Sequence, residues 1–174
     1  MANTPTPAEA GAKSGAASGL SVGDAAPGFD LPASFDRRVR SSDLSGSPYV
    51  LYFYPKADTS GCTKEACDFQ EALGALAGAA GSLPVIGVSR DPMPAIEAFA
   101  QKFSLQFPLA TDDAGATLEA YGVWVEKSMY GRRYMGIERT TLLVDAEGSI
   151  ARIWTKVKVP GHAAEVVKAA GSLT

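Results

Sequence analysis

The stretch Tyr49-Val-Leu-Tyr-Phe-Tyr54 decides the fold, because its six residues are all apolar or aromatic and Pro55 closes the run. A continuous run of this kind is typical of a strand that is buried on both faces, at the centre of a sheet. Beyond it, apolar residues recur at alternating steps of four and three, which predicts one stripe of an amphipathic helix beginning near Cys62. The stripe comprises Cys62, Ala66, Phe69, Leu73, Leu76 and Ala80.

The later segments alternate between strand and helix patterns. Strand-helix-strand order implies a right-handed parallel crossover. The polar stretch Asp145-Ala-Glu-Gly148 predicts the turn of an antiparallel hairpin. We therefore expect an α/β, thioredoxin-like fold with a central mixed sheet flanked by helices. The predicted elements are strands at 84–89, 140–144 and 149–154, and helices around Ile96 to Phe103 and over 161–170.

Length and composition indicate one folded domain. The chain has 174 residues, of which 46% are hydrophobic and 20% charged, which is ordinary globular usage. Residues 1–20 are mostly Ala, Gly, Ser, Thr and Pro, so we expect a flexible tail there and the domain at 21–174. The tail lacks the features of a signal or transit peptide, and the cytoplasm is the expected compartment.

Charge and hydropathy exclude several functions. There are 16 Lys plus Arg against 19 Asp plus Glu, a net charge of −3, and no long basic run that would predict nucleic-acid binding. No apolar stretch reaches the roughly 18 to 20 residues that a membrane-spanning helix needs. Two cysteines and a single histidine argue against a disulfide-stapled protein and against a zinc site, so we expect any role of the cysteines to be chemical.

Cys62 has the setting of a reactive thiol. A cysteine is nucleophilic as the thiolate, and a free thiol with a pKa of about 8.5 is only slightly ionised near neutrality. The first turn of a helix favours an anion through its unpaired N–H groups and its dipole. Lys64 and Glu65 nearly cancel, and the best additional cation is Arg139, because the strand from Thr140 should run antiparallel to the strand ending at Tyr54.

Cys67 lies five residues after Cys62. On an ideal helix this spacing separates the two residues by about 140° around the axis and about 8 to 9 Å between Cα atoms. A disulfide tolerates a Cα separation of up to about 7 Å, so the intact helix disfavours a static bridge. The spacing also differs from the C-x-x-C of thioredoxins, and two ordinary buried cysteines remain an alternative interpretation.

The residues before Cys62 supply a further signal. Pro55-Lys-Ala-Asp-Thr59-Ser-Gly-Cys62 matches the P-x-x-x-[TS]-x-x-C signature of peroxiredoxins. The surrounding sequence, including Gly61-Cys-Thr-Lys-Glu-Ala-Cys67, resembles the bacterioferritin comigratory protein or peroxiredoxin Q subfamily. The resemblance runs from about Val22 to the C-terminus and includes Tyr134-Met-Gly-Ile-Glu-Arg139.

The resemblance implies a thiol peroxidase for hydrogen peroxide and organic hydroperoxides. Cys62 would be the peroxidatic residue, and Cys67 would resolve its sulfenic acid as a Cys62-Cys67 disulfide, which requires the helix between them to open. Thr59 would exchange hydrogen bonds with the reacting atoms, Arg139 would stabilise negative charge, and Pro55 would shape the pocket. Thioredoxin or glutaredoxin would reduce the disulfide, and no metal or other cofactor is expected.

Two rival functions remain open at this point: a thiol-disulfide oxidoreductase without peroxidase activity, and a non-enzymatic redox sensor or chaperone-like binding protein. We expect a monomer or a weak dimer. Glu65 could orient Lys64, Arg139 or neither, and it is left out of the predicted catalytic set. His162 is expected to be solvated or to cap a helix. Trp124 and Tyr130 could border the pocket or a docking surface for the reductase, but they are expected to pack in the ordinary way.

Overall fold

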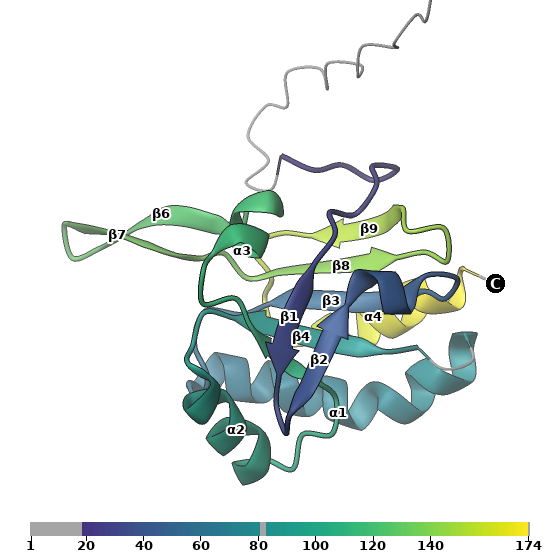
Figure 1. Ribbon diagram of the computed structural model, residues 1–174, viewed down its shortest axis with the longest axis horizontal. Coiled ribbons are helices and arrows are strands. Elements are labelled where there is room, and N and C mark those ends of the chain that lie inside the picture. Colours follow the sequence, from purple (N-terminus) through teal and green to yellow (C-terminus); the bar gives the residue numbers. More distant parts are fainter. Residues whose placement is uncertain (1–18, 81–82, 174) are drawn as a thin grey trace, which may run out of the picture.

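A seven-stranded sheet in the order β2-β1-β5-β4-β3-β8-β9 forms the centre of the molecule (Figure 1). The computed structural model describes residues 19–80 and 83–173, except for the side chains of residues 73–80. The strands of this sheet are β1 (Asp30–Ala33), β2 (Arg37–Arg40), β3 (Tyr49–Phe53), β4 (Val85–Ser89), β5 (Leu109–Thr111), β8 (Thr140–Val144) and β9 (Ile150–Trp154). The helices are a short 3-10 helix (Ser41–Leu44), α1 (Ser60–Ala80), α2 (Met93–Lys102), α3 (Ala116–Ala120) and α4 (His162–Gly171).

The sheet is mixed, as the sequence predicts. Strand β3 pairs in parallel with β4, and β4 pairs in parallel with β5, whereas β3 and β8 are antiparallel. All five residues of β3 are buried, in agreement with a strand covered on both faces. The predicted hairpin is also present, because β8 and β9 pair antiparallel around the turn that ends at Gly148.

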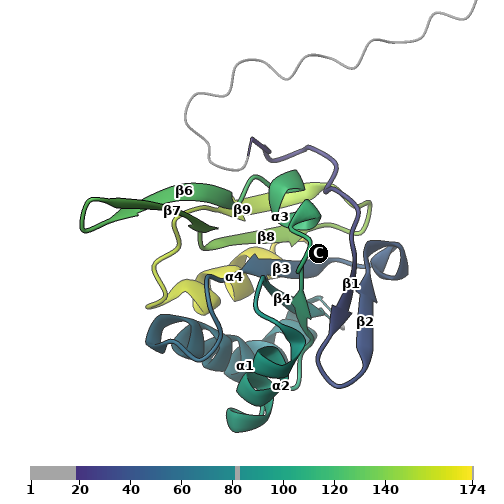
Figure 2. The same ribbon diagram turned by 60° about the vertical axis from the view of Figure 1, so that its left-hand side comes forward.

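Helices cover both faces of β3. Because successive side chains of a strand point to opposite faces, Tyr52 packs into a core with Phe69 of α1, and Phe53 packs into a second core with Leu118 of α3. Helices α1, α2 and α4 line the first core, and Figure 2 shows α1 and α2 together below the sheet. Helix α1 begins directly after the loop that follows β3, so the first core holds its amino-terminal end in place.

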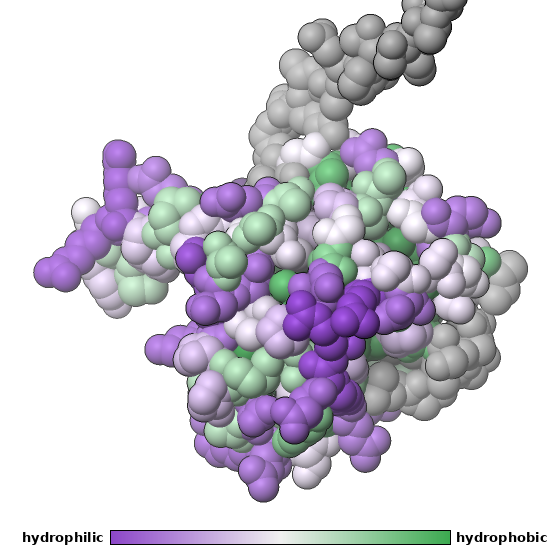
Figure 3. Space-filling view, in the orientation of Figure 1, coloured by the Kyte–Doolittle hydropathy of each residue, from purple (hydrophilic) through white to green (hydrophobic). Residues whose placement is uncertain are grey.

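A two-stranded ribbon lies outside the main sheet. It consists of β6 (Trp124–Met129) and β7 (Arg132–Ile137), which pair antiparallel with each other. The ribbon projects from the body (Figure 1), with Tyr130 and Gly131 at its tip at φ values of 52° and 76°. The sequence analysis placed no strands here. Figure 3 shows hydrophilic surface at its outer end.

Some expectations fall outside the described residues. Of the predicted tail at residues 1–20, the structure describes Gly19 and Leu20, and Leu20 packs against the second core. The stripe positions Leu73, Leu76 and Ala80 lie in helix α1, but their side chains are not among those described. In the part of the chain that the structure describes, no helix is both long and apolar enough to cross a bilayer.

Candidate active site

Cys62 lies in the first turn of α1, as predicted. The helix begins at Ser60, and the backbone N–H of Thr63 already donates to the carbonyl of Thr59 at 2.8 Å. The first N–H groups of a helix have no partners within it and carry the positive end of the helix dipole. The Cys62 side chain is 1% exposed, so its sulfur lies in this field with little screening by water.

Arg139 contacts Cys62 directly. The residue immediately precedes β8, whose first residue Thr140 pairs with Phe53 at the end of β3. One guanidinium nitrogen, Nη2, donates to the Cys62 Sγ at 3.4 Å. The predicted proximity of Arg139 and Cys62 is therefore confirmed. Gly61 permits this approach, because a Cβ at that position would stand 3.2 Å from Nη2.

Glu65 also belongs to this site, although it was left out of the predicted catalytic set. Its Oε1 accepts a hydrogen bond from Arg139 Nη1 at 2.7 Å, and its side chain is 1% exposed. Its other oxygen, Oε2, has no hydrogen-bond partner among the described residues. The signal was available in the sequence, because position 65 is three residues after Cys62 and therefore lies on the same buried face of the helix.

The charges of Glu65 and Arg139 depend on each other. Burial raises the pKa of Glu65 to about 7, although the adjacent Arg139 opposes the shift. Burial alone would lower the pKa of Arg139, but the charges of Glu65 and Cys62 outweigh it and the pKa is raised. Arg139 thus keeps its positive charge at neutral pH while half-buried, and Glu65 fixes the direction of its guanidinium.

The loop between β3 and α1 carries Pro55 and Thr59. Asp58, at a φ of 58°, forms an ion pair with Lys102 at the end of α2, with Nζ and Oδ2 3.0 Å apart. The Thr59 hydroxyl donates to the carbonyl of Lys56 at 2.9 Å, and the residue is exposed. In this state Thr59 therefore braces the loop, and its predicted hydrogen bonds with reacting atoms stay a prediction. Pro55 is half-buried behind it.

Cys67 is half-buried further along α1, and both cysteines are free thiols. Burial raises the pKa of the Cys67 thiol, and the carboxylates of Asp68 and Glu71 raise it further, while Lys64 opposes them. Cys67 is accordingly a protonated thiol at neutral pH. The two cysteines of α1 thus have different environments, because the sulfur of Cys62, and not that of Cys67, accepts a hydrogen bond from the Arg139 guanidinium.

A hollow of about 530 Å³ adjoins this site. Pro55 and Lys56 line it from the loop after β3, together with residues of the β6–β7 ribbon. Arg90 reaches into the same region, with its guanidinium 4.6 Å from the ring centroid of Trp124. Residues of the ribbon that line it include Trp124, Lys127, Tyr134 and Ile137.

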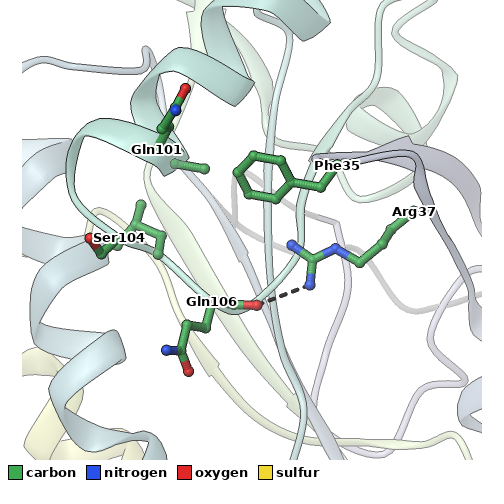
Figure 4. Close-up of a pocket in the computed structure, with 7 residues that line it drawn as sticks. Phe35, Arg37, Gln101, Ser104 and Gln106 are labelled. Atoms are coloured by element: carbon green, nitrogen blue, oxygen red, sulfur yellow. Dashed lines mark hydrogen bonds between the residues drawn. The ribbon is translucent and has the colours of Figure 1, made fainter.

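A second pocket, of about 490 Å³, is unrelated to the cysteines (Figure 4). Phe35 and Arg37 line it from the β1–β2 turn, and Gln101, Ser104 and Gln106 line it from the end of α2 and the residues after it. Arg37 Nη1 donates to the Gln106 carbonyl at 2.9 Å, which is the dashed line in Figure 4. None of the predicted site residues borders this pocket.

The predicted solvent exposure of His162 is wrong. It is 5% exposed rather than solvated, and its Nε2 lies 2.8 Å from the Thr141 hydroxyl. Its ring packs edge-on against Phe69 and Trp154. The expectation was wrong because the residue begins α4 on the face that packs against α1. Tyr130 was also expected to pack, but it is 97% exposed at the tip of the ribbon.

The described residues contain no group of three or more His, Cys, Asp or Glu side chains arranged to hold a metal ion. The chemistry available at this place is that of a buried thiol, a guanidinium that contacts it, and a carboxylate that orients the guanidinium. Such an arrangement can hold a thiolate and can stabilise negative charge that moves onto an attacked oxygen.

Comparison with known proteins agrees with this chemistry. Residues 22–153 match the model of the AhpC/TSA family. The chain is 47% identical over 148 residues to a putative peroxiredoxin bcp of Coxiella burnetii, covering 85% of this chain and 97% of that protein. It is 42% identical over 149 residues to peroxiredoxin Bcp of Bacillus subtilis, covering 86% and 94%.

Solved structures of similar proteins agree with the sequence comparison. A structure of peroxiredoxin Q from Xanthomonas campestris superposes with a TM-score of 0.78 at 38% identity, covering 83% of this chain and 90% of that one. A second structure from this organism, of its bacterioferritin comigratory protein, has a TM-score of 0.77 with the same identity and coverage. That structure was determined to explain the alkyl peroxide reduction activity of the Xanthomonas campestris protein.

Proposed function

The chain belongs to the AhpC/TSA family and is a peroxiredoxin, a thiol-dependent peroxidase, and from this premise we propose that Cys62 is the thiol that reduces the hydroperoxide. One observation carries the proposal: the Arg139 guanidinium donates to the Cys62 sulfur at the amino-terminal end of a helix. At Cys67, by contrast, burial and the carboxylates of Asp68 and Glu71 raise the pKa and disfavour the thiolate.

In the first step, the Cys62 thiolate attacks the terminal oxygen of the hydroperoxide. A sulfur–oxygen bond forms, the oxygen–oxygen bond breaks, and the leaving oxygen takes a proton to become water or an alcohol. Two electrons pass from the sulfur to the peroxide, and Cys62 becomes a sulfenic acid. Negative charge moves from sulfur to the leaving oxygen, so Arg139 and the first N–H groups of α1 stabilise the transition state.

In the second step, the Cys67 thiol gives up its proton and its sulfur attacks the sulfenic sulfur of Cys62. The disulfide forms, the sulfur–oxygen bond breaks, and the hydroxide leaves as water once protonated. An external dithiol, thioredoxin or glutaredoxin, then opens the disulfide by two exchange reactions and is itself oxidised. We propose the cytoplasm as the compartment and a monomer or weak dimer as the working form.

The substrates we propose are hydrogen peroxide and organic hydroperoxides. The description of the Xanthomonas campestris relative supports the organic class, because it names alkyl peroxide reduction. The hollow beside Pro55 supports it as well, since its lining includes apolar residues such as Trp124 and Met135 that can contact an alkyl group.

The test is steady-state turnover with hydrogen peroxide and with an alkyl hydroperoxide, coupled to purified thioredoxin or glutaredoxin. We expect repeated turnover in the parent protein and none in Cys62→Ser, because a hydroxyl at that position stays protonated at neutral pH. Stoichiometric oxidation without turnover under every reductant would instead support the redox sensor. Turnover that survives in Cys62→Ser would remove Cys62 from the reaction.

A further inference from the structure

We propose that Lys127 is a second cation of the Cys62 site, acting on the thiolate through its charge beside Arg139. The inference rests on the proposed function of Cys62 and adds a residue from the β6–β7 ribbon. Lys127 therefore gives this projecting ribbon a part in the first oxidation step.

The side chain of Lys127 is held in a defined place. Its Nζ donates a hydrogen bond to the carbonyl of Ile137, two residues before Arg139. Its stem passes over Gly136 on the neighbouring strand, where an added Cβ would stand 3.3 Å from Cδ and 3.5 Å from Cε. A glycine at that position leaves room for the stem. The contact with Gly136 and the hydrogen bond to Ile137 therefore restrict the conformations of the Lys127 side chain.

Lys127 lies beside the loop that carries Cys62. It lines the same hollow as Pro55, which lies on the loop that leads to Cys62. Burial lowers the pKa of Lys127, and the positive charge of Arg139 lowers it further, while Glu138 and the Cys62 thiolate oppose this. The hydrogen bond to Ile137 and the shared hollow place the Lys127 ammonium group at the end of β7 that leads to Arg139.

A cation in this position favours the reaction for a simple reason. The attacking thiolate and the leaving oxygen are both negative, and a half-buried positive charge is screened less than one in water. Removing the charge takes away part of the stabilisation of the attacking thiolate and of the leaving oxygen. The charged and titratable groups around Lys127 are Arg139, Glu138 and Cys62, with its strand partner Tyr134 and with Lys56, Arg90, Asp91 and Asp113 around the hollow.

The experiment compares single-turnover oxidation of Cys62 by hydrogen peroxide in Lys127→Met, Lys127→Arg and a control, Arg132→Met. Arg132 is exposed on the same face of the ribbon, so its variant removes an equal charge without touching the site. We expect Lys127→Met to slow oxidation by about five-fold to ten-fold and to move its pH profile to higher pH. Lys127→Arg should stay within about two-fold of the parent, and Arg132→Met should match it.

A merely structural role of Lys127 is separated by two readouts. Such a role would lower the rate without moving the pH profile, and Lys127→Arg would not rescue it, so this result would overturn the proposal. Gly136→Ala keeps the lysine but displaces its stem and should also slow oxidation. Parent-like rates in both Lys127→Met and Gly136→Ala would overturn the proposal too. Loss of oxidation in the parent would instead refute the role of Cys62.

Discussion

At the scale of single residues, the account depends on the guanidinium of Arg139. It contacts the Cys62 sulfur and is oriented by Glu65, so its removal takes away a preorganised positive charge. We expect Arg139→Met to slow sulfenic acid formation by about 100-fold. Stopped-flow fluorescence checks this, with Arg133→Met as the control because Arg133 is exposed on the ribbon. A parent-like rate in Arg139→Met would show that another group provides the charge.

Glu65 gives a pH dependence of known sign. Its pKa is about 7 in the folded protein against an ordinary value of 4.5, so the folded state binds more protons between these two values. The free energy of unfolding therefore falls as pH rises across this interval, by about 3 kcal/mol in all. Urea unfolding from pH 4.5 to 7.5 should show this contribution in the parent and not in Glu65→Gln. Equal pH slopes would mean that Glu65 titrates normally.

The sequence could predict Arg139 but not its partner. Arg139 followed from strand order, since an antiparallel strand beside β3 must begin near the end where the cysteine loop starts. Glu65 was left out of the catalytic set because the sequence did not decide whether it orients Lys64, Arg139 or neither. The structure shows that the two side chains have different environments. Glu65 is buried and forms an ion pair with Arg139, whereas Lys64 is exposed and forms an ion pair with Asp68.

At the scale of elements, α1 must change during the proposed cycle. A disulfide between residues five apart on a helix requires the first turns to open, because the intact helix holds their Cα atoms about 8 to 9 Å apart. Hydrogen exchange of the reduced and disulfide forms should therefore show weaker protection of residues 62–70 in the disulfide form, with β3 and β4 unchanged. The Cys67→Ser variant treated with peroxide is the control. Equal protection in both forms would refute the opening of the helix.

The elements differ in how far the sequence could predict them. Strand β3 and helix α1 have strong signals, because one is buried throughout and the other carries a stripe of period 3.6. The ribbon formed by β6 and β7 has no such signal. Both of its faces are partly exposed, with Met129, Tyr134 and Met135 at 56%, 44% and 49%, so apolar and polar residues do not alternate along it.

At the scale of the whole molecule, His162 connects the helical layer to the sheet. It lies at the start of α4, bonds to Thr141 of β8 and packs against Phe69 of α1. Burial lowers its pKa and Arg139 lowers it further, while Glu165 opposes them. The unfolded chain thus binds a proton more readily, and stability is lost as pH falls below the ordinary histidine value of about 6.5.

His162→Gln tests this contribution, because the amide can still bond to Thr141 but cannot titrate. We expect the free energy of unfolding of the parent to fall more steeply than that of His162→Gln between pH 7 and pH 5. Measuring both in the Glu65→Gln background removes the opposite contribution of Glu65 in the same range. Parallel curves there would show that His162 is not held neutral by its burial.

The central claim is that Cys62 becomes a sulfenic acid and that Cys67 resolves it. The most direct measurement treats Cys67→Ser with one equivalent of hydrogen peroxide in the presence of dimedone and maps the adduct by peptide mass spectrometry. The account predicts a single adduct on Cys62, and a Cys62-Cys67 disulfide without adduct in the parent protein. Consumption of the peroxide with no adduct on Cys62 would contradict the account.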